Sequence, residues 1–242
     1  MKVIVTKNYD EMSIEAGKIM AQIIKNKPDC VLGLATGSTP VGMYDYLTAQ
    51  YEAKEISFAK ASSINLDEYY PITPDNDQSY RYFMNVNLFD RVDIDKANTF
   101  VPNGCAEDVA KECAEYDARI ERMGIDVQIL GIGRNGHIGF NEPAEEICAQ
   151  THLTELTPDT INANARFFAS EDDVPKHALT LGLGSMFKAR KILLLASGKN
   201  KAEAIAKLLA TSAITTSCPA TLLRLHPDVT VICDEDAYSL VK

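Results

Sequence analysis

The sequence lacks three features: an excess of basic residues, a long apolar run and closely paired cysteines. Its 242 residues include 24 Lys and Arg against 34 Asp and Glu, which gives a formal net charge of −10. Proteins that wrap nucleic acid or adhere to anionic membranes need clustered positive charge, so we expect neither partner. No segment reaches the roughly 18 apolar residues of a membrane span, and the acidic Asp10 interrupts the first residues before a signal peptide could form. These absences predict a cytoplasmic protein.

The cysteines have neither metal-site nor redox-site spacing, because none forms a C-x-x-C pair. Most stand beside aliphatic or small residues, which predicts reduced and mostly buried thiols. A chain of this length hides roughly 70–75% of its unfolded surface, so its core needs no disulfide or metal for stability. The six cysteines are Cys30, Cys105, Cys113, Cys148, Cys218 and Cys233.

Short aliphatic runs alternate with amphipathic stretches along the chain. Each run is nearly continuously apolar and often β-branched, which is typical of strands buried on both faces of a parallel sheet. The stretches 12–23 and 109–123 place apolar residues at helical spacing. This alternation predicts βαβ units and an α/β fold, Rossmann-like, with three α/β/α layers and a mostly parallel central sheet. The predicted strands are 3–5, 30–35, 61–66, 127–130, 192–196 and 229–233.

The chain shows no internal repeat, low-complexity tract or Gly/Ser linker, and its ten prolines are scattered. We therefore expect a single domain over residues 1–242. In open parallel sheets, ligands bind beyond the carboxyl ends of the strands. The residues that follow each apolar run are thus where chemistry is expected.

The second run is followed by a polar turn, Thr36-Gly37-Ser38-Thr39-Pro40. Pro40 suits the first position of a helix and Gly37 permits a tight turn, so backbone N–H groups and hydroxyls could cradle an anion there. The lysine of a Walker loop is absent. An ordinary capped strand-to-helix turn explains the same residues equally well.

The third run ends at two adjacent acids, Asp67 and Glu68. Neighbouring side chains of an extended segment point to opposite sides, so only one of the two can face the crevice. A buried carboxylate in that place could act as a general base. Most carboxylates, however, belong to solvated loops, and these residues alone leave both interpretations open.

The fourth run leads into a glycine-rich loop, GIGRNGHIGFNEP, over residues 131–143. Its G-x-G-x-x-G spacing is that of a dinucleotide fingerprint, but such a loop should open an apolar helix, whereas this one continues to Pro143. The loop instead gathers Asn135, His137 and Glu142. Histidine moves protons near neutral pH, and a nearby carboxylate or amide can orient it, so His137 is a catalytic candidate.

The fifth run ends in SGKNK, residues 197–201, before a predicted helix over 202–209. Cations such as Lys201 at a strand-to-helix turn could complete a phosphate site. Solvated surface lysines are the more common explanation of such residues.

In this order, these segments resemble the glucosamine-6-phosphate deaminase family, also called glucosamine-6-phosphate isomerases. The resemblance covers essentially the whole chain, and its GHIGFNEP string is highly specific. Related 6-phosphogluconolactonases share a similar first loop and a His loop, but not the Phe-Asn-Glu-Pro sequence. The matching strings are LATGSTP (34–40), NLDEYY (65–70), GIGRNGHIGFNEP (131–143), NARFF (164–168) and SGKNKA (197–202).

The resemblance implies conversion of glucosamine 6-phosphate and water to fructose 6-phosphate and ammonium, with no redox cofactor and no catalytic metal. His137 would open the sugar ring, Glu142 would orient His137, and Asp67 would move a proton from C2 to C1. An ordinary Asp pKa of about 3.9 would leave Asp67 ionised at neutral pH. The residues implied to hold the phosphate are Thr36, Gly37, Ser38, Thr39, Arg166 and Lys201.

Two departures from the family pattern narrow these expectations. Many members have Asp where this chain has Asn135, which can orient His137 by hydrogen bonding but cannot stabilise its charged form as a carboxylate would. Hexameric members that N-acetylglucosamine 6-phosphate activates have basic residues where residues 151–154 here read THLT, and they extend further at the carboxyl terminus. We therefore expect hyperbolic kinetics and a monomer or small homo-oligomer.

Two other functions stay open at this point. One is a 6-phosphogluconolactonase-type hydrolase, which would cleave an ester without removing a proton from carbon. The other is a non-catalytic sugar-phosphate-sensing domain, as in the effector domains of transcription regulators. A regulator needs a DNA-binding module, and no basic helix-turn-helix precedes the first predicted strand.

Overall fold

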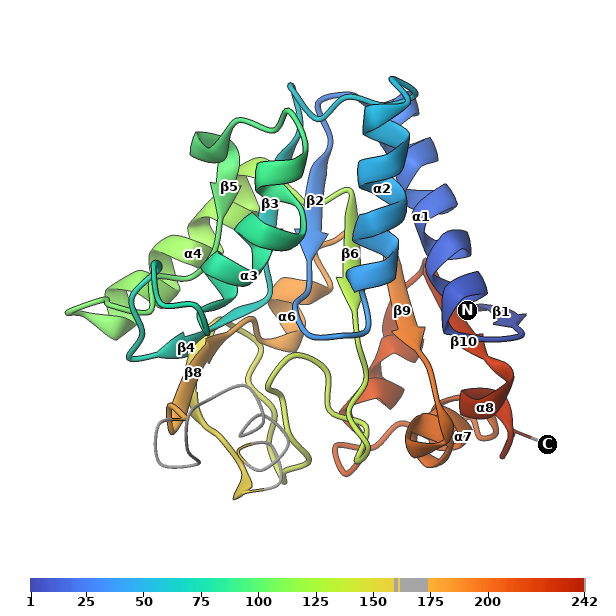
Figure 1. Ribbon diagram of the computed structural model, residues 1–242. Coiled ribbons are helices and arrows are strands. Elements are labelled where there is room, and N and C mark those ends of the chain that lie inside the picture. The colour runs from blue at the N-terminus through green and yellow to red at the C-terminus, as the bar shows by residue number, and fades with distance from the viewer. Residues whose placement is uncertain (159–160, 162–173, 242) are drawn as a thin grey trace.

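The chain folds around a seven-stranded parallel sheet, as the computed structural model shows (Figure 1). The structure describes residues 1–158, 161 and 174–241. All six predicted strands belong to this sheet, whose order is β1-β10-β9-β6-β2-β3-β5, and the two-residue β5 is an addition. The strands are β1 (Lys2–Thr6), β2 (Val31–Leu34), β3 (Ser62–Asn65), β5 (Thr99–Phe100), β6 (Val127–Leu130), β9 (Ile192–Ala196) and β10 (Val229–Asp234).

Helices flank the sheet on both faces, so the predicted three-layer α/β/α fold is confirmed (Figure 1). The predicted helical stretches form α1, α4 and α7, and α1 begins where the Asn8 side chain accepts the N–H of Glu11 at 2.9 Å. None of the helices in the described part of the chain is long and apolar enough to cross a bilayer. The helices are α1 (Tyr9–Asn26), α2 (Val41–Glu52), α3 (Tyr80–Asn87), α4 (Val109–Met123), α6 (Leu183–Met186), α7 (Ala202–Leu209) and α8 (Glu235–Tyr238).

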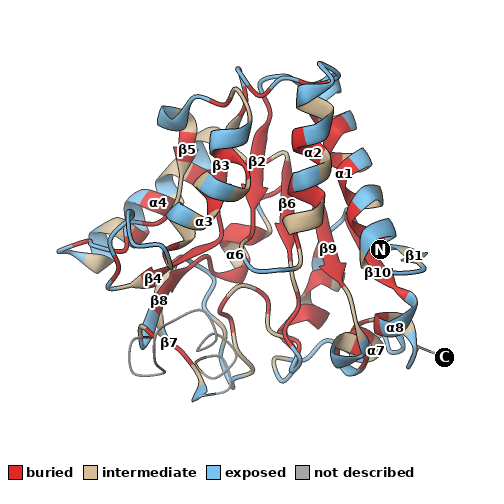
Figure 2. Cartoon of the chain, viewed as in Figure 1, coloured by how far each residue is buried: buried red, intermediate tan, exposed pale blue. Residues whose placement is uncertain are grey.

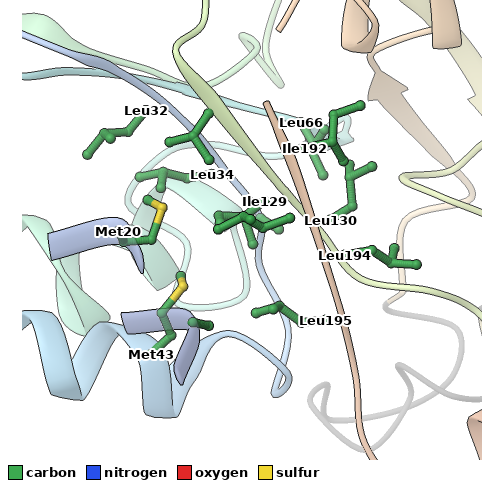
Figure 3. Packing of buried hydrophobic residues seen from close by; sticks show 14 of the residues in the cluster. Met20, Leu32, Leu34, Met43, Leu66, Ile129, Leu130, Ile192, Leu194 and Leu195 are labelled. Carbon is green, nitrogen blue, oxygen red and sulfur yellow. The ribbon is translucent and has the colours of Figure 1, made fainter. Parts of the chain in front are cut away.

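The main core lies between the helices and the central strands, which are buried along their length (Figure 2). Figure 3 shows part of it, with Met20 of α1 and Met43 of α2 in one cluster with residues of β2, β6 and β9. The edge strand β1 differs, because it pairs with β10 alone and leaves Val3 and Val5 about two-fifths exposed, at 38% and 43%. The expectation that each strand is buried on both faces was therefore wrong for β1. The six cysteines are free thiols, of which Cys30, Cys113, Cys218 and Cys233 are buried and Cys105 and Cys148 are exposed.

A second sheet of three antiparallel strands, in the order β4-β8-β7, adjoins the end of β3. It consists of β4 (Asp67–Tyr70), β7 (His152–Glu155) and β8 (His177–Thr180). Only Leu66 separates β3 from β4, so the chain leaves the parallel sheet at that residue and pairs with β8 instead. These strands have four residues each and mix polar with apolar side chains, which is why a search for apolar runs missed them.

The strand order reverses between β2 and β6. From β2 the chain proceeds outward through β3 and β5, whereas from β6 it proceeds the other way through β9 and β10. Because β2 and β6 are hydrogen-bonded neighbours, the loops that follow them diverge to opposite faces and open a crevice between them. The loops after β9, β6, β2 and β3 therefore follow one another along this edge of the sheet. They are the four loops that contain most of the predicted site residues.

Candidate active site

The loop between β2 and α2 presents backbone N–H groups at this edge. Gly37 has a φ angle of +84°, in the left-handed region that favours glycine. Pro40 stands at the N-cap, one residue before the helical position predicted for it, and its side chain caps no N–H group. Among the described residues, no protein group accepts a hydrogen bond from the N–H groups of residues 36–39. Free N–H groups before a helix attract anions, so the loop suits a phosphate.

Two cations stand near one another at the same edge. Lys201 precedes α7 directly, and Arg134 belongs to the loop after β6. Burial, and then the positive charge of Arg134, lowers the pKa of Lys201. Neither cation takes part in an ion pair within the described residues. A bound anion would relieve this repulsion. The sequence did not single out Arg134, whereas the predicted Arg166 lies outside the described residues.

A buried carboxylate holds the loop that leads to Lys201. Asp234, at the end of β10, accepts hydrogen bonds from Ser197 Oγ at 2.5 Å and from the N–H of Gly198 at 3.0 Å. It also accepts the N–H of Ala237 at 2.8 Å and so begins α8. Asp234 directly follows the predicted strand 229–233, so its position could have indicated this role, but the sequence analysis did not name it.

The loop after β6 brings His137, Glu142 and Asn135 together. His137 Nδ1 lies 3.1 Å from Glu142 Oε1, although without the alignment of a hydrogen bond. Asn135 Nδ2 donates to Glu142 Oε2 at 2.6 Å, and the backbone N–H of His137 donates to Asn135 Oδ1 at 3.1 Å. Asn135 therefore orients the Glu142 carboxylate and the His137 backbone. We expected Asn135 to orient the imidazole by a direct hydrogen bond. Its two bonds instead go to the Glu142 carboxylate and to the backbone N–H of His137, so it acts on the ring indirectly.

Two glycines of this loop allow other side chains to pack directly against its backbone. The His137 ring lies against Gly133, where a Cβ atom would be 2.3 Å from the ring carbon Cε1. Gly136 has a φ angle of +88°, and a Cβ there would be 2.3 Å from Cys218 Sγ. Residues 131–151 contain no helix. The loop therefore differs from a dinucleotide-binding turn, as its sequence indicated.

Asp67 is 7% exposed, which excludes the interpretation of a solvated acidic loop. Burial, and then the charge of Glu68, raises the pKa of Asp67 to about 8. The expectation of an ordinary pKa was therefore wrong, because a carboxylate loses the hydration that stabilises its charge when it is buried. Tyr44 of α2 is close enough to Asp67 that the carboxylate contributes to raising the pKa of its phenol.

The second acid, Glu68, is 2% exposed and turns toward the start of α3. Its carboxylate accepts N–H groups from Tyr69 at 2.9 Å, Tyr80 at 2.8 Å and Arg81 at 2.9 Å. Burial nevertheless raises the pKa of Glu68 to about 7, because desolvation outweighs these bonds. Glu68 thus fastens α3 to the strand of Asp67.

The small sheet joins Asp67 to the histidine loop. Asp67 of β4 stands opposite Thr180 of β8, and Thr180 Oγ1 accepts the N–H of Phe140 at 3.2 Å. Directly paired residues of antiparallel strands have Cα atoms roughly 4.5–5.5 Å apart. The ring of Phe140 also stacks on Tyr80, with ring centroids 6.2 Å apart and an angle of 6° between the planes. Three residues after His137, Phe140 therefore reaches both β8, the strand paired with that of Asp67, and the helix that Glu68 holds.

Two surface hollows lie elsewhere. One of about 400 Å³ is lined by residues near Pro28 and Ile56, and one of about 650 Å³ lies between α4 and β7. Neither is lined by a predicted site residue. The candidate active site is thus identified by its buried carboxylate, its imidazole, and the N–H groups and cations that find no partner in the described part of the chain.

Comparison with known proteins identifies the family. Residues 9–232 match the model of a family described as glucosamine-6-phosphate isomerases/6-phosphogluconolactonase. The chain belongs to this family. A glucosamine-6-phosphate deaminase of Clostridium perfringens is 59% identical over the full length of both chains. One from Thermoanaerobacter pseudethanolicus is 57% identical over all of this chain and 95% of its own.

Solved structures agree with this membership of the isomerase and lactonase family. A monomeric glucosamine-6-phosphate deaminase has a TM-score of 0.96 and 46% identity, with 99% of this chain and 100% of that chain covered. A 6-phosphogluconolactonase from Thermotoga maritima has a TM-score of 0.74 and 23% identity, with 96% and 98% covered. The second similarity shows a common fold only. The resemblance deduced from the sequence motifs is confirmed.

Proposed function

We propose that this chain converts glucosamine 6-phosphate and water to fructose 6-phosphate and ammonium. The observation that carries the proposal is the link, through Thr180, between the buried carboxylate of Asp67 and the loop of the His137–Glu142 pair. A carboxylate and an imidazole in adjoining segments suit a reaction that moves one proton on oxygen and another on carbon. The high identity to proteins named glucosamine-6-phosphate deaminase supports this substrate.

His137 would open the pyranose ring by taking the proton of the C1 hydroxyl and then giving a proton to the ring oxygen as the bond from C1 to that oxygen breaks. Glu142, 3.1 Å from Nδ1, would stabilise the imidazolium that forms between these two steps. Asn135 would hold Glu142 in place through its 2.6 Å bond. The product of this stage is an open-chain aldehyde.

Asp67 would then remove the proton from C2 and return it to C1. The electron pair of the broken C2–H bond forms a C1=C2 double bond while the aldehyde oxygen takes a proton from the C2 ammonium, which gives an enol with an amino group at C2. When Asp67 returns its proton to C1, the nitrogen lone pair forms the C2=N bond of a protonated imine. Water adds to this imine, and the nitrogen departs as ammonia. Since water enters only after the proton transfer, the chemistry is that of an isomerase and deaminase, and it needs no metal or redox cofactor. A metal chelator should leave the rate unchanged.

Asp67 must be ionised to act as a base, although in the free protein its pKa is raised to about 8. The substrate itself can favour the ionised form of Asp67. Its C2 nitrogen is next to the proton to be removed, and an ammonium there would stabilise the Asp67 carboxylate. Substrate binding would thus convert the protonated acid to the base that the reaction needs.

The phosphate of the substrate would bind at the N–H groups of Thr36, Gly37, Ser38 and Thr39. Lys201 would supply the main charge, and Arg134 is a further cation at this edge. Arg166 stays a prediction from the family motif. A few such groups at short range outweigh a net charge of −10, because salt screens exposed acids beyond roughly 8–10 Å.

An assay of ammonia against acid release tests the proposal. The protein is incubated with glucosamine 6-phosphate and, separately, with 6-phosphogluconolactone. We expect ammonia from the first and no acceleration of acid release from the second. Asp67→Asn should abolish ammonia release while phosphate-sugar binding persists. A hydrolysed lactone would favour the lactonase alternative, and sugar-phosphate binding without any turnover would favour a sensor.

We also propose that the chain acts as a single domain and as a monomer in the cytoplasm. The proposal of one domain is supported by Asp67, which stands in the small sheet while its partners follow strands of the large one. The monomer is supported by the similarity to a solved deaminase described as monomeric.

A further inference from the structure

The amino ends of α1 and α2 approach so closely that a side chain of α1 reaches the loop of residues 36–40. A Cβ atom at Gly42, in the first turn of α2, would lie 2.6 Å from Ser13 Oγ and 3.2 Å from Tyr9 Cε1. Glycine at this position therefore allows the close approach. As a result the Tyr9 ring lies beside the first turn of α2.

The hydroxyl of Tyr9 makes two hydrogen bonds to this region. It accepts the N–H of Gly42 at 2.9 Å and donates to the carbonyl oxygen of Ser38 at 2.9 Å. The N–H of Gly42 belongs to the first turn of α2, where no intrahelical acceptor exists and Pro40 offers no side-chain cap. Tyr9 thus caps α2 from another helix and, with the same oxygen, fixes the loop before it.

The hydrogen bond from Tyr9 to the Ser38 carbonyl also determines the direction of the Thr39 N–H group. The carbonyl of Ser38 and the N–H of Thr39 belong to one planar trans peptide, so they point in opposite directions. Because Tyr9 holds the Ser38 oxygen, the N–H of Thr39 is turned away from Tyr9. No acceptor for this N–H exists among the described residues.

We propose that Tyr9 is a positioning residue for the substrate phosphate, which holds the peptide between Ser38 and Thr39 with its N–H toward the bound anion. The inference rests on the proposed phosphate site. Tyr9 itself need not touch the substrate, because both its proton and an acceptor position of its oxygen are used within the protein. Its effect falls on binding of the phosphate and not on the proton transfers.

Tyr9→Phe tests this inference, because it keeps the ring against Gly42 and removes the hydroxyl. We expect KM for glucosamine 6-phosphate to rise about 3- to 10-fold, with kcat changed less than about two-fold. The inhibition constant of inorganic phosphate should rise by the same factor. Tyr46→Phe is the matched control, since Tyr46 of α2 packs against Gly17 and its hydroxyl has no hydrogen-bond partner among the described residues. It should leave both constants unchanged.

Equal phosphate inhibition constants in Tyr9→Phe and the unaltered protein would overturn the inference, as would a loss of kcat at constant KM. Amide hydrogen exchange on the unaltered protein gives a second measurement, which is needed if the variant does not fold. Inorganic phosphate should slow exchange at Thr39, and exchange there that is indifferent to phosphate would contradict the inference. Absence of ammonia release would instead overturn the proposed function, and calorimetric binding of phosphate would still test Tyr9.

Discussion

Asn135 and Glu142 are joined by a hydrogen bond of 2.6 Å, and the other oxygen of that carboxylate lies 3.1 Å from His137 Nδ1. Asn135→Asp would place a second carboxylate beside Glu142 and so add negative charge near the imidazole. This charge favours the imidazolium. We expect the acid limb of the kcat profile to move to higher pH by about half a unit or more, because in the substrate complex Asp67 no longer limits the rate near pH 8.

The matched control for this prediction is Asn26→Asp, which makes the same charge change at the end of α1. Asn26 precedes β2, so it belongs to the opposite edge of the sheet. Its side-chain oxygen accepts a bond from Gln22, a role that Asp can keep. An acid limb that stays in place in Asn135→Asp, or moves equally in both variants, would contradict the assignment.

The burial of Asp67 predicts a particular pH–rate profile. With its pKa raised to about 8 in the free protein, kcat/KM should increase with pH up to a limb near pH 8. The limb of kcat should occur at lower pH, because the substrate ammonium stabilises the carboxylate in the complex. Steady-state rates between pH 6 and 9.5, in buffers of constant ionic strength, check this. Limbs at the same pH in both parameters would mean that the substrate does not alter the ionisation of Asp67.

Asp67 also predicts how stability depends on pH. Its pKa is about 3.9 in an unfolded chain and about 8 in the folded one, so the folded state binds the proton more tightly. Its contribution to the free energy of unfolding is complete below about pH 4 and is lost as pH rises to about 8, by up to about 1.4 kcal/mol per pH unit.

Asp67→Asn measures this contribution, because the amide cannot ionise. The unfolding free energy of the unaltered protein minus that of the variant should fall by about 2–4 kcal/mol between pH 5 and pH 8 in urea titrations. The pKa of Glu68 is also raised, to about 7, but Glu68 is present in both proteins and its contribution largely cancels. A difference that is constant with pH would contradict the burial of an acidic Asp67.

Thr180 joins the strand pair of Asp67 to the loop of His137, so under the proposed mechanism its hydroxyl should matter for catalysis. Thr180→Val keeps the shape and leaves the N–H of Phe140 without its acceptor. We expect kcat to fall about ten-fold and the free energy of unfolding by about 1–2 kcal/mol. Thr180→Ser retains the hydroxyl and should recover most of kcat. Equal rates in the two variants would show that this bond does not position the histidine loop.

The sequence predicts the parts of this molecule that depend on local pattern. The central strands are visible in the sequence as continuous apolar runs. The rule that ligands bind at the carboxyl edge of a parallel sheet then predicts which loops contain the site. Strands β4, β7 and β8 have no such run, since their small sheet mixes polar with apolar residues. The raised pKa of Asp67 depends on what surrounds it in the folded chain. Tyr9 and Asp234 act on loops 29 and 36 residues away along the chain, a relation that only the packing of helices and strands creates.

The groove between α4 and β7 bears on regulation. Residues 151–153 line it. They belong to the stretch THLT, in which this chain lacks the basic residues expected of hexameric, activated family members. Its lining includes Asp117 and Glu121 and no Lys or Arg, and Glu121 already pairs with Lys188, so the groove offers no free cation to a phosphorylated activator. We therefore expect a hyperbolic dependence of rate on glucosamine 6-phosphate, unchanged by N-acetylglucosamine 6-phosphate, and a monomer in light scattering. A sigmoidal curve that this compound makes hyperbolic would contradict the prediction, and it would place the activator at a site other than this acidic groove.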